Sequence, residues 1–354
     1  MDNYTDMTTS NKLRIGITSL GRMGWVHLQT LASHADFTVV GVADPLAERR
    51  AEAVAKFGCQ AFATHEELIS AGQLDVIVIA SPTHLHLPMA VAAFKAGLHV
   101  FLEKPMALTL AEARAIAQAA KRARRVLTVC QPHRLMAYHQ QTRLAIESGK
   151  LGKVYHIKRA GFGWVRRNDW QAISKFGGGM LNNHGAHYID QLLDLTGRDI
   201  ERLFCRLGRV AAMGDAEDVV KLVYQTRAGI LGEVEINQAT PHNTYELEVY
   251  GTHGTLWKEG NTLKLRYFIP AELPAREMET TLASAGRQYP RDNAKFYDET
   301  IAIDSKFGLE VFADLARAIR TGGEPYVKPV ETLAVMQMLE RCRKSAKHII
   351  ETPL

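Results

Sequence analysis

The sequence predicts an α/β protein in which a doubly wound parallel sheet is followed by an α+β domain with an open, mostly antiparallel sheet. Over residues 13–130, short apolar runs alternate with helical segments, which is typical of right-handed βαβ units. After residue 131 the strand-like runs become longer, alternate in polarity and follow one another with short turns, as antiparallel strands do. The length of 354 residues exceeds an ordinary single core and favours two domains.

Apolar runs and helical periodicity place the elements of the first part. The predicted strands cover residues 13–18, 37–43, 75–80, 98–102 and 126–130. The predicted helices cover residues 23–33, 47–57, 84–96 and 110–124. Two local signals support these helices, because Thr109 and Glu112 form a capping box and Gly97 fits the left-handed position after a helix.

The second part follows a different pattern. The predicted strands cover residues 154–160, 219–225, 230–237, 245–250 and 255–258, and the polar stretch 271–295 predicts a long loop. Two helices, over residues 309–320 and 330–350, finish the chain. We therefore expect a disordered tail over 1–12, a first domain over 13–130 and a second domain over 131–354, whose closing helices are able to pack back on the first.

Composition and charge argue against several classes of protein. The hydrophobic content of 46% and the charged content of 23% fit a soluble globular chain. No apolar run approaches the ~18–20 residues of a membrane-spanning helix, and the polar amino terminus is no secretory signal. The net charge of +5 is mild, and the basic run 121–125 lies at a helix end, where cations favour the dipole. We expect neither a nucleic-acid nor a membrane partner.

Cysteine usage points to a reducing compartment. The four cysteines, Cys59, Cys130, Cys205 and Cys342, lie far apart without CxxC spacing. A disulfide framework and structural zinc are therefore not expected. Reduced thiols in a chain without a secretory signal favour a cytoplasmic protein.

A dinucleotide fingerprint follows the first predicted strand. The segment Ser19-Leu20-Gly21-Arg22-Met23-Gly24 is GxGxxG with serine in the first position, and a helix follows it. The later glycines allow close approach to a pyrophosphate, which the N–H groups of the helix amino terminus would bind. Asp44 ends the second strand, where a carboxylate binds ribose hydroxyls and repels a 2′-phosphate. NAD is favoured over NADP, although Arg49 and Arg50 soften that preference; the alternative for Asp44 is an ordinary turn residue.

Two further strand ends carry candidate site residues. Glu103-Lys104-Pro105 closes the fourth strand, because proline cannot donate to a sheet ladder. A lysine at this edge can donate protons and stabilise an oxyanion; the alternative is a surface lysine in a loop. The third strand runs into residues 81–86, where Thr83 is expected to cap a helix and His86 to face the nicotinamide pocket. An HxH pair, His84 and His86, lacks a third ligand, so no metal is predicted.

The run 177–190 is the second informative stretch. Its three consecutive glycines allow the backbone to pass close to a ligand. Asn183, His187 and Asp190 are spaced i, i+4 and i+7 and would share one helical face. His187 can act as acid and base, Asn183 can hold a hydroxyl, and Asp190 can orient His187. The alternative is the polar face of a surface helix.

Together these stretches resemble the glucose–fructose oxidoreductase / inositol dehydrogenase (Gfo/Idh/MocA) family. The resemblance is carried by the fingerprint and by residues 96–105 and 177–190, with support from 131–134 and 149–154, and it spans nearly the whole chain from Leu13. It implies a Rossmann domain, an open-faced mixed sheet domain, a nicotinamide cofactor and sugar or polyol substrates. It also implies a homodimer or homotetramer.

The resemblance implies that Lys104 and His187 flank the reacting carbon. The other contacts are expected from the motifs and segments in which the residues lie. Cofactor contacts are expected from Ser19, Leu20, Gly21, Arg22, Met23, Gly24, Asp44, Ser81, Pro82, Thr83, His86, Glu103 and Lys104. Substrate contacts are expected from Asn183, Arg134, Trp164, Arg166, Arg167 and Trp170, with Asp169 beside them. The chain departs from the family pattern at Ser19, where glycine is usual, and at Asn183, where many members have aspartate.

The expected activity is NAD-dependent hydride transfer between nicotinamide and a secondary alcohol or ketone of a sugar, an inositol-like polyol or a sugar acid. Two arginines near the glycine run would suit a carboxylate, but they are equally consistent with exposed loop residues. A second enzyme hypothesis is redox-assisted lyase or glycosidase chemistry, in which NAD is regenerated at each turnover. A third hypothesis, from a different class, is a non-catalytic sensor that binds NAD and a sugar.

Overall fold

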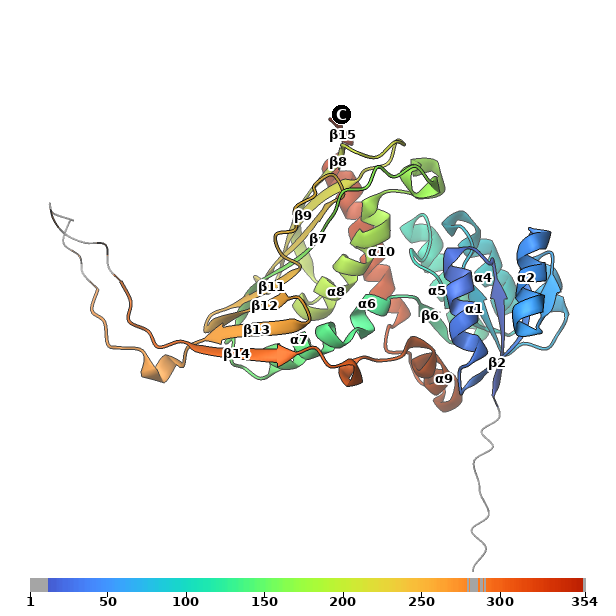
Figure 1. Ribbon diagram of the computed structural model, residues 1–354, viewed down its shortest axis with the longest axis horizontal. Coiled ribbons are helices and arrows are strands. Elements are labelled where there is room, and N and C mark those ends of the chain that lie inside the picture. Colours follow the sequence, from blue (N-terminus) through green and yellow to red (C-terminus); the bar gives the residue numbers. More distant parts are fainter. Residues whose placement is uncertain (1–11, 279, 281–285, 287–288, 290, 353–354) are drawn as a thin grey trace, which may run out of the picture.

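The computed structural model describes residues 12–278, 280, 286, 289 and 291–352, and it contains two sheets with helices between them (Figure 1). The tail expected over residues 1–12 lies, apart from Lys12, outside the described residues, as does part of the loop expected over 271–295. The α/β architecture predicted from the sequence is confirmed.

The first sheet has six parallel strands in the order β3-β2-β1-β4-β5-β6. Its strands are β1 (Leu13–Thr18), β2 (Phe37–Ala43), β3 (Gln60–Phe62), β4 (Val76–Ile79), β5 (His99–Leu102) and β6 (Leu127–Val129). The chain adds β2 and β3 on one side of β1 and then β4, β5 and β6 on the other, so the strand order reverses between β1 and β4. Ligands bind at such a switch point, beyond the carboxyl ends of the strands.

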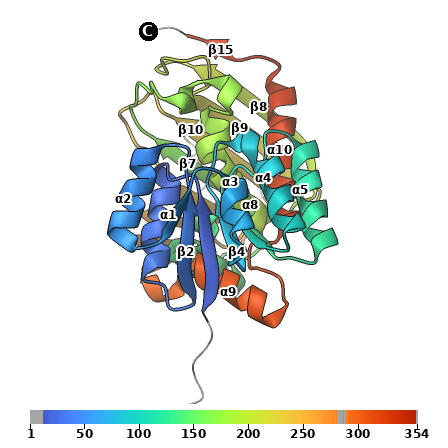
Figure 2. The ribbon, with the colours of Figure 1, turned by 90° about the vertical axis from the view of Figure 1, so that its right-hand side faces the viewer.

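Helices cover both faces of this sheet (Figure 2). They are α1 (Arg22–Ala32), α2 (Ala47–Phe57), α3 (His65–Ser70), η1 (Thr83–Leu85), α4 (His86–Lys95) and α5 (Leu110–Ala123). Alternate residues of β4 serve the two faces, since Val76 packs with α1 and α2 while Ile77 packs with α4 and α5. The capping box of Thr109 and Glu112 and the left-handed Gly97 are both confirmed.

The second sheet has nine strands in the order β14-β13-β12-β11-β7-β10-β9-β8-β15. They are β7 (Val154–Phe162), β8 (Ile200–Arg209), β9 (Val219–Thr226), β10 (Leu231–Asn237), β11 (Leu247–Gly251), β12 (Gly254–Glu259), β13 (Thr262–Tyr267), β14 (Tyr297–Ala302) and β15 (Ile350–Glu351). The pairs β7–β10 and β8–β15 are parallel, and the other pairs are antiparallel. The predicted mostly antiparallel sheet is confirmed.

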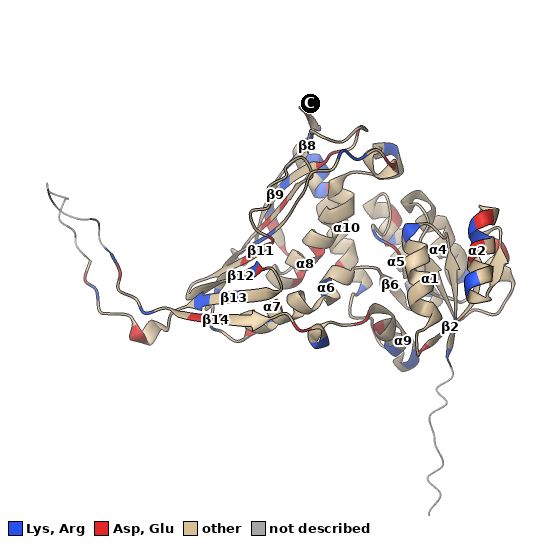
Figure 3. Ribbon diagram, in the orientation of Figure 1, with Lys and Arg blue, Asp and Glu red and all other residues tan. Residues whose placement is uncertain are grey.

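The remaining helical segments connect and cover the two sheets. They are α6 (Pro132–Leu135), α7 (Ala137–Glu147), η2 (Trp170–Ala172), η3 (Ser174–Phe176), η4 (Leu181–Gly185), α8 (Ala186–Thr196), η5 (Pro270–Glu272), η6 (Ser305–Phe307), α9 (Val311–Thr321) and α10 (Pro329–Ala346). Acidic and basic residues both occur along the strands of the second sheet (Figure 3). Lys221, for example, bonds Glu233 at 2.6 Å and Glu235 at 2.7 Å.

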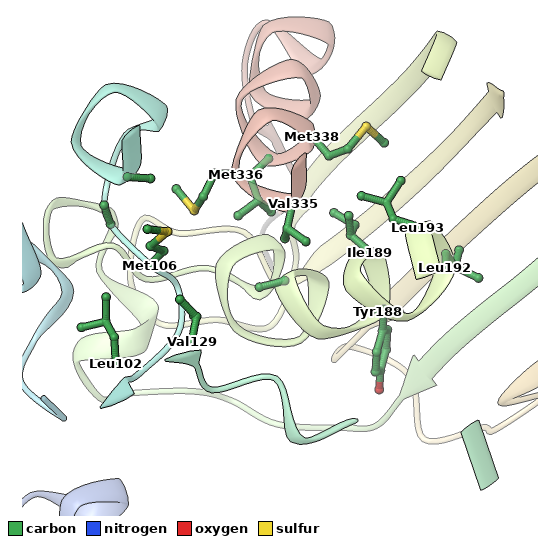
Figure 4. Packing of buried hydrophobic residues seen from close by; sticks show 14 of the residues in the cluster. Leu102, Met106, Val129, Tyr188, Ile189, Leu192, Leu193, Val335, Met336 and Met338 are labelled. Carbon is green, nitrogen blue, oxygen red and sulfur yellow. The ribbon is translucent and has the colours of Figure 1, made fainter. Parts of the chain in front are cut away.

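A continuous apolar core joins the two sheets. It extends from Leu102 and Val129 of the first sheet to Ile189 and Leu192 of α8 and Met336 of α10 (Figure 4). This packing places the carboxyl ends of β5 and β6 against the amino-terminal end of α8. Side chains that follow β5 and β6 therefore lie close to side chains at the start of α8.

Helix α9 belongs to the core of the first sheet, although it comes late in the sequence. Phe312 packs with Phe101 of β5, with ring centroids 4.8 Å apart, and with Phe37 of β2 at 6.1 Å. Leu315 joins the same buried cluster. The boundary predicted between residues 130 and 131 stays a prediction.

Candidate active site

The fingerprint loop has the local geometry of an anion cradle. A Cβ on Gly24 would lie 1.8 Å from the carbonyl oxygen of Ser19, so the helix packs too closely on the strand end for any side chain there. A Cβ on Gly21 would meet nothing within 4 Å, which leaves open space over the loop. Helix α1 begins at Arg22 without a side-chain cap, so its first N–H groups are available to a pyrophosphate. The loop therefore fits the dinucleotide expected from the sequence.

Ser19 occupies a backbone conformation that favours glycine. Its φ is +71°, in the left-handed region, and its N–H donates to the Ala43 carbonyl at 2.7 Å. A residue with a Cβ is strained in this region. The departure from the family pattern at this position thus has a physical cost.

Asp44 holds the fingerprint loop from the end of β2. One carboxylate oxygen accepts the Leu20 N–H at 2.7 Å, and the other accepts the Leu46 N–H at 2.9 Å. Arg49 approaches the first oxygen at 3.4 Å, whereas Arg50 donates to the Asp44 carbonyl at 2.8 Å. The bond to Leu46 is the contact of an ordinary turn residue, which was the alternative role of Asp44. The bond to Leu20 places the same carboxylate against the fingerprint, as its predicted role requires.

In the loop after β4, Thr83 and His86 do not have the roles predicted from the sequence. Thr83 is buried in the first turn of η1 and does not act as its cap. His86 is 1% exposed; its Nε2 lies 3.0 Å from the Ser81 carbonyl and its Nδ1 lies 3.1 Å from the Pro105 carbonyl. The predicted cofactor contact of His86 is wrong, because both ring nitrogens join two loops of the protein. The buried Ser81 Oγ has no protein partner among the described residues, which fits a polar ligand at this edge.

Glu103 is turned into the interior. Its Oε1 lies 2.6 Å from His27 Nε2, and its Oε2 accepts the Lys104 N–H at 3.1 Å. The predicted contact of this carboxylate with the cofactor does not fit that burial. The Cys130 thiol lies beside these groups, and burial together with Glu103 raises the thiol pKa well above its usual value. The direct bond between His27 and Glu103 ties helix α1 to the strand end that carries Lys104.

Lys104 reaches from the first sheet to the second domain. Its Nζ donates to the carbonyl oxygen of Asn183 at 3.1 Å and to Asn183 Oδ1 at 3.0 Å. Burial lowers the pKa of Lys104, although the neighbouring Glu103 carboxylate works in the opposite direction. Asn183 lies in η4, a π-helical turn, a type of irregularity often found at functional sites.

His187 lies in the first turn of α8 and is 7% exposed. Its Nδ1 lies 2.7 Å from Gln131 Oε1, and its ring stacks on that of His133 with centroids 4.3 Å apart. Burial, reinforced by the charge of Lys104, lowers the pKa of His187 well below its usual value. The imidazole is therefore neutral at pH 7 and is able to accept a proton.

Two predictions about charged neighbours are wrong. Asp190 does not orient His187; its Oδ2 accepts the Arg134 Nε–H at 2.8 Å, and its other oxygen accepts the Arg134 Nη2–H. Arg134 is 1% exposed and also bonds Glu331, so its guanidinium is held between carboxylates and is not free for substrate. Arg134, Asp190 and Glu331 thus join α6, α8 and α10.

The arginine- and tryptophan-rich segment lies at the surface. Trp164 and Trp170 are about half exposed, and Arg166 is exposed. Arg167 lies 3.2 Å from Asp169, which lies 4.0 Å from Arg22 of the fingerprint. The segment thus approaches the fingerprint from the second domain, while the substrate contacts of these residues stay predictions.

Sequence reasoning missed three residues near His187. Gln131 lies between β6 and α6, His133 lies in α6, and His184 lies in η4. Burial lowers the pKa of His133 and of His184 to about 4, so both rings are neutral at pH 7. A usable signal was present, because Gln131 comes at the carboxyl end of a parallel strand, the edge at which ligands bind.

The fold and the site define a two-domain, dinucleotide-dependent oxidoreductase, in which a phosphate-binding loop and a strand-end lysine meet a histidine from an open sheet. A family model described as an oxidoreductase family with an NAD-binding Rossmann fold matches residues 13–131. A model of the GFO/IDH/MocA C-terminal domain matches residues 139–257. The chain belongs to the Gfo/Idh/MocA family of oxidoreductases, and its first sheet forms an NAD-binding Rossmann domain.

Individual relatives are distant. The chain is 29% identical over 247 residues to the rhizopine catabolism protein MocA of Rhizobium meliloti, covering 69% of this chain and 77% of that one. It is 26% identical over 260 residues to myo-inositol 2-dehydrogenase of Thermotoga maritima, covering 70% and 75%. A levoglucosan dehydrogenase solved with NADH and levoglucosan shares the fold with a TM-score of 0.77 and 22% identity, covering 95% and 98%.

The described part of the chain contains no helix that combines the length and the apolar character needed to cross a membrane.

Proposed function

We propose that this protein is an NAD-dependent dehydrogenase that transfers hydride between nicotinamide and a secondary alcohol or ketone of a sugar, a polyol or a sugar acid. The observation that carries the proposal is the contact of Lys104 Nζ with Asn183, four residues before the buried, neutral His187. A cationic donor and a proton acceptor thereby flank one place at the ligand edge of an NAD-binding sheet. The inositol and sugar dehydrogenases among the relatives support this substrate class.

The cofactor would be held by the cradle around residues 19–24, by Asp44 and by the loop that begins at Ser81. The expected contacts of Leu20, Arg22, Met23 and Pro82 belong to this proposal. When bound, NAD supplies the hydride acceptor. The Asp44 carboxylate favours NAD over NADP, because it would repel a 2′-phosphate.

Lys104 is proposed to bind the oxygen of the reacting carbon. An ammonium group has three donors, and Asn183 accepts from Nζ at two oxygens, so one N–H remains for the substrate. His187 is proposed to accept the hydroxyl proton, because its ring is neutral. Asn183 cannot accept a proton, but its amide –NH2 can donate to a neighbouring hydroxyl.

The surrounding segments complete the proposal. Arg166, Arg167, Trp164 and Trp170 are proposed to contact the parts of the substrate away from the reacting carbon. We also propose the division into a domain of residues 13–130 and a domain of residues 131–354. A homodimer or homotetramer is the proposed assembly.

The test is NADH formation from NAD with a panel of inositols, neutral sugars and sugar acids. Lys104→Met is measured in parallel, with Lys121→Met on the exposed face of α5 as the matched control. Turnover that is lost in Lys104→Met and retained in Lys121→Met would support the dehydrogenase. Product release without net NADH would replace it with internal redox chemistry, and NAD binding without turnover would favour the sensor.

A further inference from the structure

Gln131 contacts one edge of the His187 ring, through its Oε1 and the ring Nδ1 at 2.7 Å. We propose that Gln131 is a positioning residue, which holds the proton of neutral His187 on Nδ1 and so leaves Nε2 as the proton acceptor. This proposal rests on the proposed dehydrogenase function. It concerns which atom of His187 reacts and which residue decides it.

The orientation of the Gln131 amide follows from its second contact. Its Nε2 donates to the carbonyl oxygen of Ala186 at 3.4 Å. The flipped amide would place two carbonyl oxygens against each other at that distance, which is repulsive. Oε1 must therefore face His187, and an oxygen that only accepts requires an N–H on Nδ1. Since a neutral imidazole has a single N–H, its Nε2 carries the lone pair.

Gln131 is itself held firmly. It is 1% exposed, and its carbonyl accepts the Arg134 N–H at 3.2 Å in the first turn of α6. The preceding residue is tied to the first sheet, since the Cys130 N–H donates to the Leu102 carbonyl at 2.8 Å. His133, two residues later, covers the face of the His187 ring, with an angle of 14° between the rings. One short segment thus fixes both the edge and the face of the imidazole.

An amide in this position has a different effect from a carboxylate. Gln131 selects the tautomer but adds no negative charge that would stabilise an imidazolium. The titratable groups around His187 come from several elements: Lys104 after β5, His133 on α6, Arg159 on β7 and His184 on η4. Each of these groups disfavours a positive charge on His187, and Asp190 is already bonded to Arg134.

The assigned step balances in the direction of oxidation. The O–H bond of the substrate would break with its proton passing to His187 Nε2, and NAD+, when bound, would supply the acceptor for the hydride of the C–H bond. The carbonyl forms from the electron pair of the O–H bond. The proton on Nε2 then leaves to solvent, because the surrounding cations make the imidazolium a good acid, and Nδ1 keeps its proton throughout.

A first experiment needs no substrate. The ring nitrogens of His187 are observed by 15N NMR in the full-length protein at pH 7.5, with assignment by comparison with His187→Gln. We expect Nδ1 protonated and Nε2 unprotonated in the wild type, and a mixture of tautomers in Gln131→Met. An Nε2–H tautomer in the wild type, or no change in Gln131→Met, would overturn the proposal.

A second experiment measures the pH dependence of kcat/KM. Gln131→Glu adds a carboxylate beside the imidazole, so the pKa of His187 should rise by about one unit or more and the acidic limb should move to higher pH. Gln131→Met should lower kcat about tenfold or more while leaving the KM for NAD nearly unchanged. An unshifted acidic limb in Gln131→Glu would count against the proposal.

Control variants at Gln141 separate this effect from damage to the fold. Gln141 is also a buried glutamine with two backbone partners, the Ala302 carbonyl and the Asp304 N–H, but it lies on α7. Gln141→Glu and Gln141→Met should leave the tautomer and the pH profile unchanged. If no substrate is turned over, the proposed function fails while the NMR result still decides the tautomer.

Discussion

Lys104 and Asn183, which are 79 residues apart in the sequence, are joined by two hydrogen bonds from one ammonium group, at 3.1 Å to the backbone oxygen and at 3.0 Å to Oδ1. The lysine comes from the end of a parallel strand and the asparagine from a π-helical turn of the other domain. Both acceptors are neutral, so no carboxylate of the second domain balances the ammonium charge at this contact.

Replacing Asn183 by aspartate should make the site behave as one with the more usual residue. A carboxylate about 3 Å from Nζ favours the ammonium form, so the pKa of Lys104 should rise by about 1–3 units. The new carboxylate should also raise the pKa of His187, because a nearby negative charge favours the imidazolium. The acidic limb of kcat/KM should therefore move to higher pH. The pH profile of Asn183→Asp is compared with that of Asn182→Asp; equal profiles for Asn183→Asp and the wild type would contradict the expectation.

Replacing Ser19 by glycine should stabilise the protein. The left-handed backbone, with φ of +71°, costs a residue with a Cβ about 1 kcal/mol relative to glycine. The free energy of unfolding from urea titration should therefore rise by about that amount in Ser19→Gly. Ser19→Ala keeps the strain and serves as the control, and equal stability of the two variants would refute the explanation.

Replacing Arg134 by methionine should be strongly destabilising. The change leaves Asp190 without its bonded guanidinium, while Glu331 keeps Arg198 at 2.6 Å, and breaking a buried pair in this way costs about 3–5 kcal/mol. Arg202 is 76% exposed at its side chain, so Arg202→Met should change stability by less than about 0.5 kcal/mol. Urea titrations of both variants make the comparison, and a similar small loss in each would show that the network is not structural.

Replacing Asp44 by serine should weaken binding of NAD more than binding of NADP. The change removes the charge that repels a 2′-phosphate, while Arg49, now 3.4 Å from the carboxylate, becomes free to bind that phosphate. We expect the ratio of the two dissociation constants to shift by about tenfold or more toward NADP. Calorimetric titration with each cofactor measures the ratio, and an unchanged ratio would remove Asp44 from the cofactor site.

Acid should destabilise the first domain through His99. Burial lowers the pKa of His99 to about 4, and its Nδ1 accepts the Val126 N–H at 2.9 Å. Between pH 6.5 and about 4 the unfolded chain binds a proton that the folded chain does not, so the stability from this group is present above pH 6.5 and is lost as the pH falls. His99→Asn keeps a hydrogen-bond acceptor, so its free energy of unfolding should fall less steeply than that of the wild type between pH 6.5 and about 4. His242→Asn, at an exposed position, should show the same fall as the wild type.

The sequence allowed the first sheet to be predicted almost completely, because buried parallel strands are short apolar runs between capped helices. The strand Gln60–Phe62 and the helix His65–Ser70 were missed, since each is too short to show periodicity. In the second sheet, the strands β8, β13, β14 and β15 were missed. β14 comes shortly after the polar stretch 271–295 that was predicted as a loop, and β15 has only two residues.

The candidate site could be predicted only where motifs carry it. Lys104 and His187 were identified from local signals, but the partner of each ring or carboxylate depends on contacts between distant segments. Helical spacing placed Asp190 near His187, whereas the guanidinium of Arg134, 56 residues earlier, binds that carboxylate instead. Gln131, also 56 residues from His187, takes the place that Asp190 was expected to fill.

The position of α9 has a consequence for biosynthesis. Phe312 and Leu315 complete the apolar cluster around Phe37 and Phe101, yet they are made long after the first sheet has left the ribosome. A nascent chain that ends before residue 311 therefore exposes apolar side chains of a sheet whose six strands have all been synthesised. Chaperone dependence, and sensitivity to premature termination, should accordingly centre on the amino-terminal half until nearly all of the chain has been synthesised.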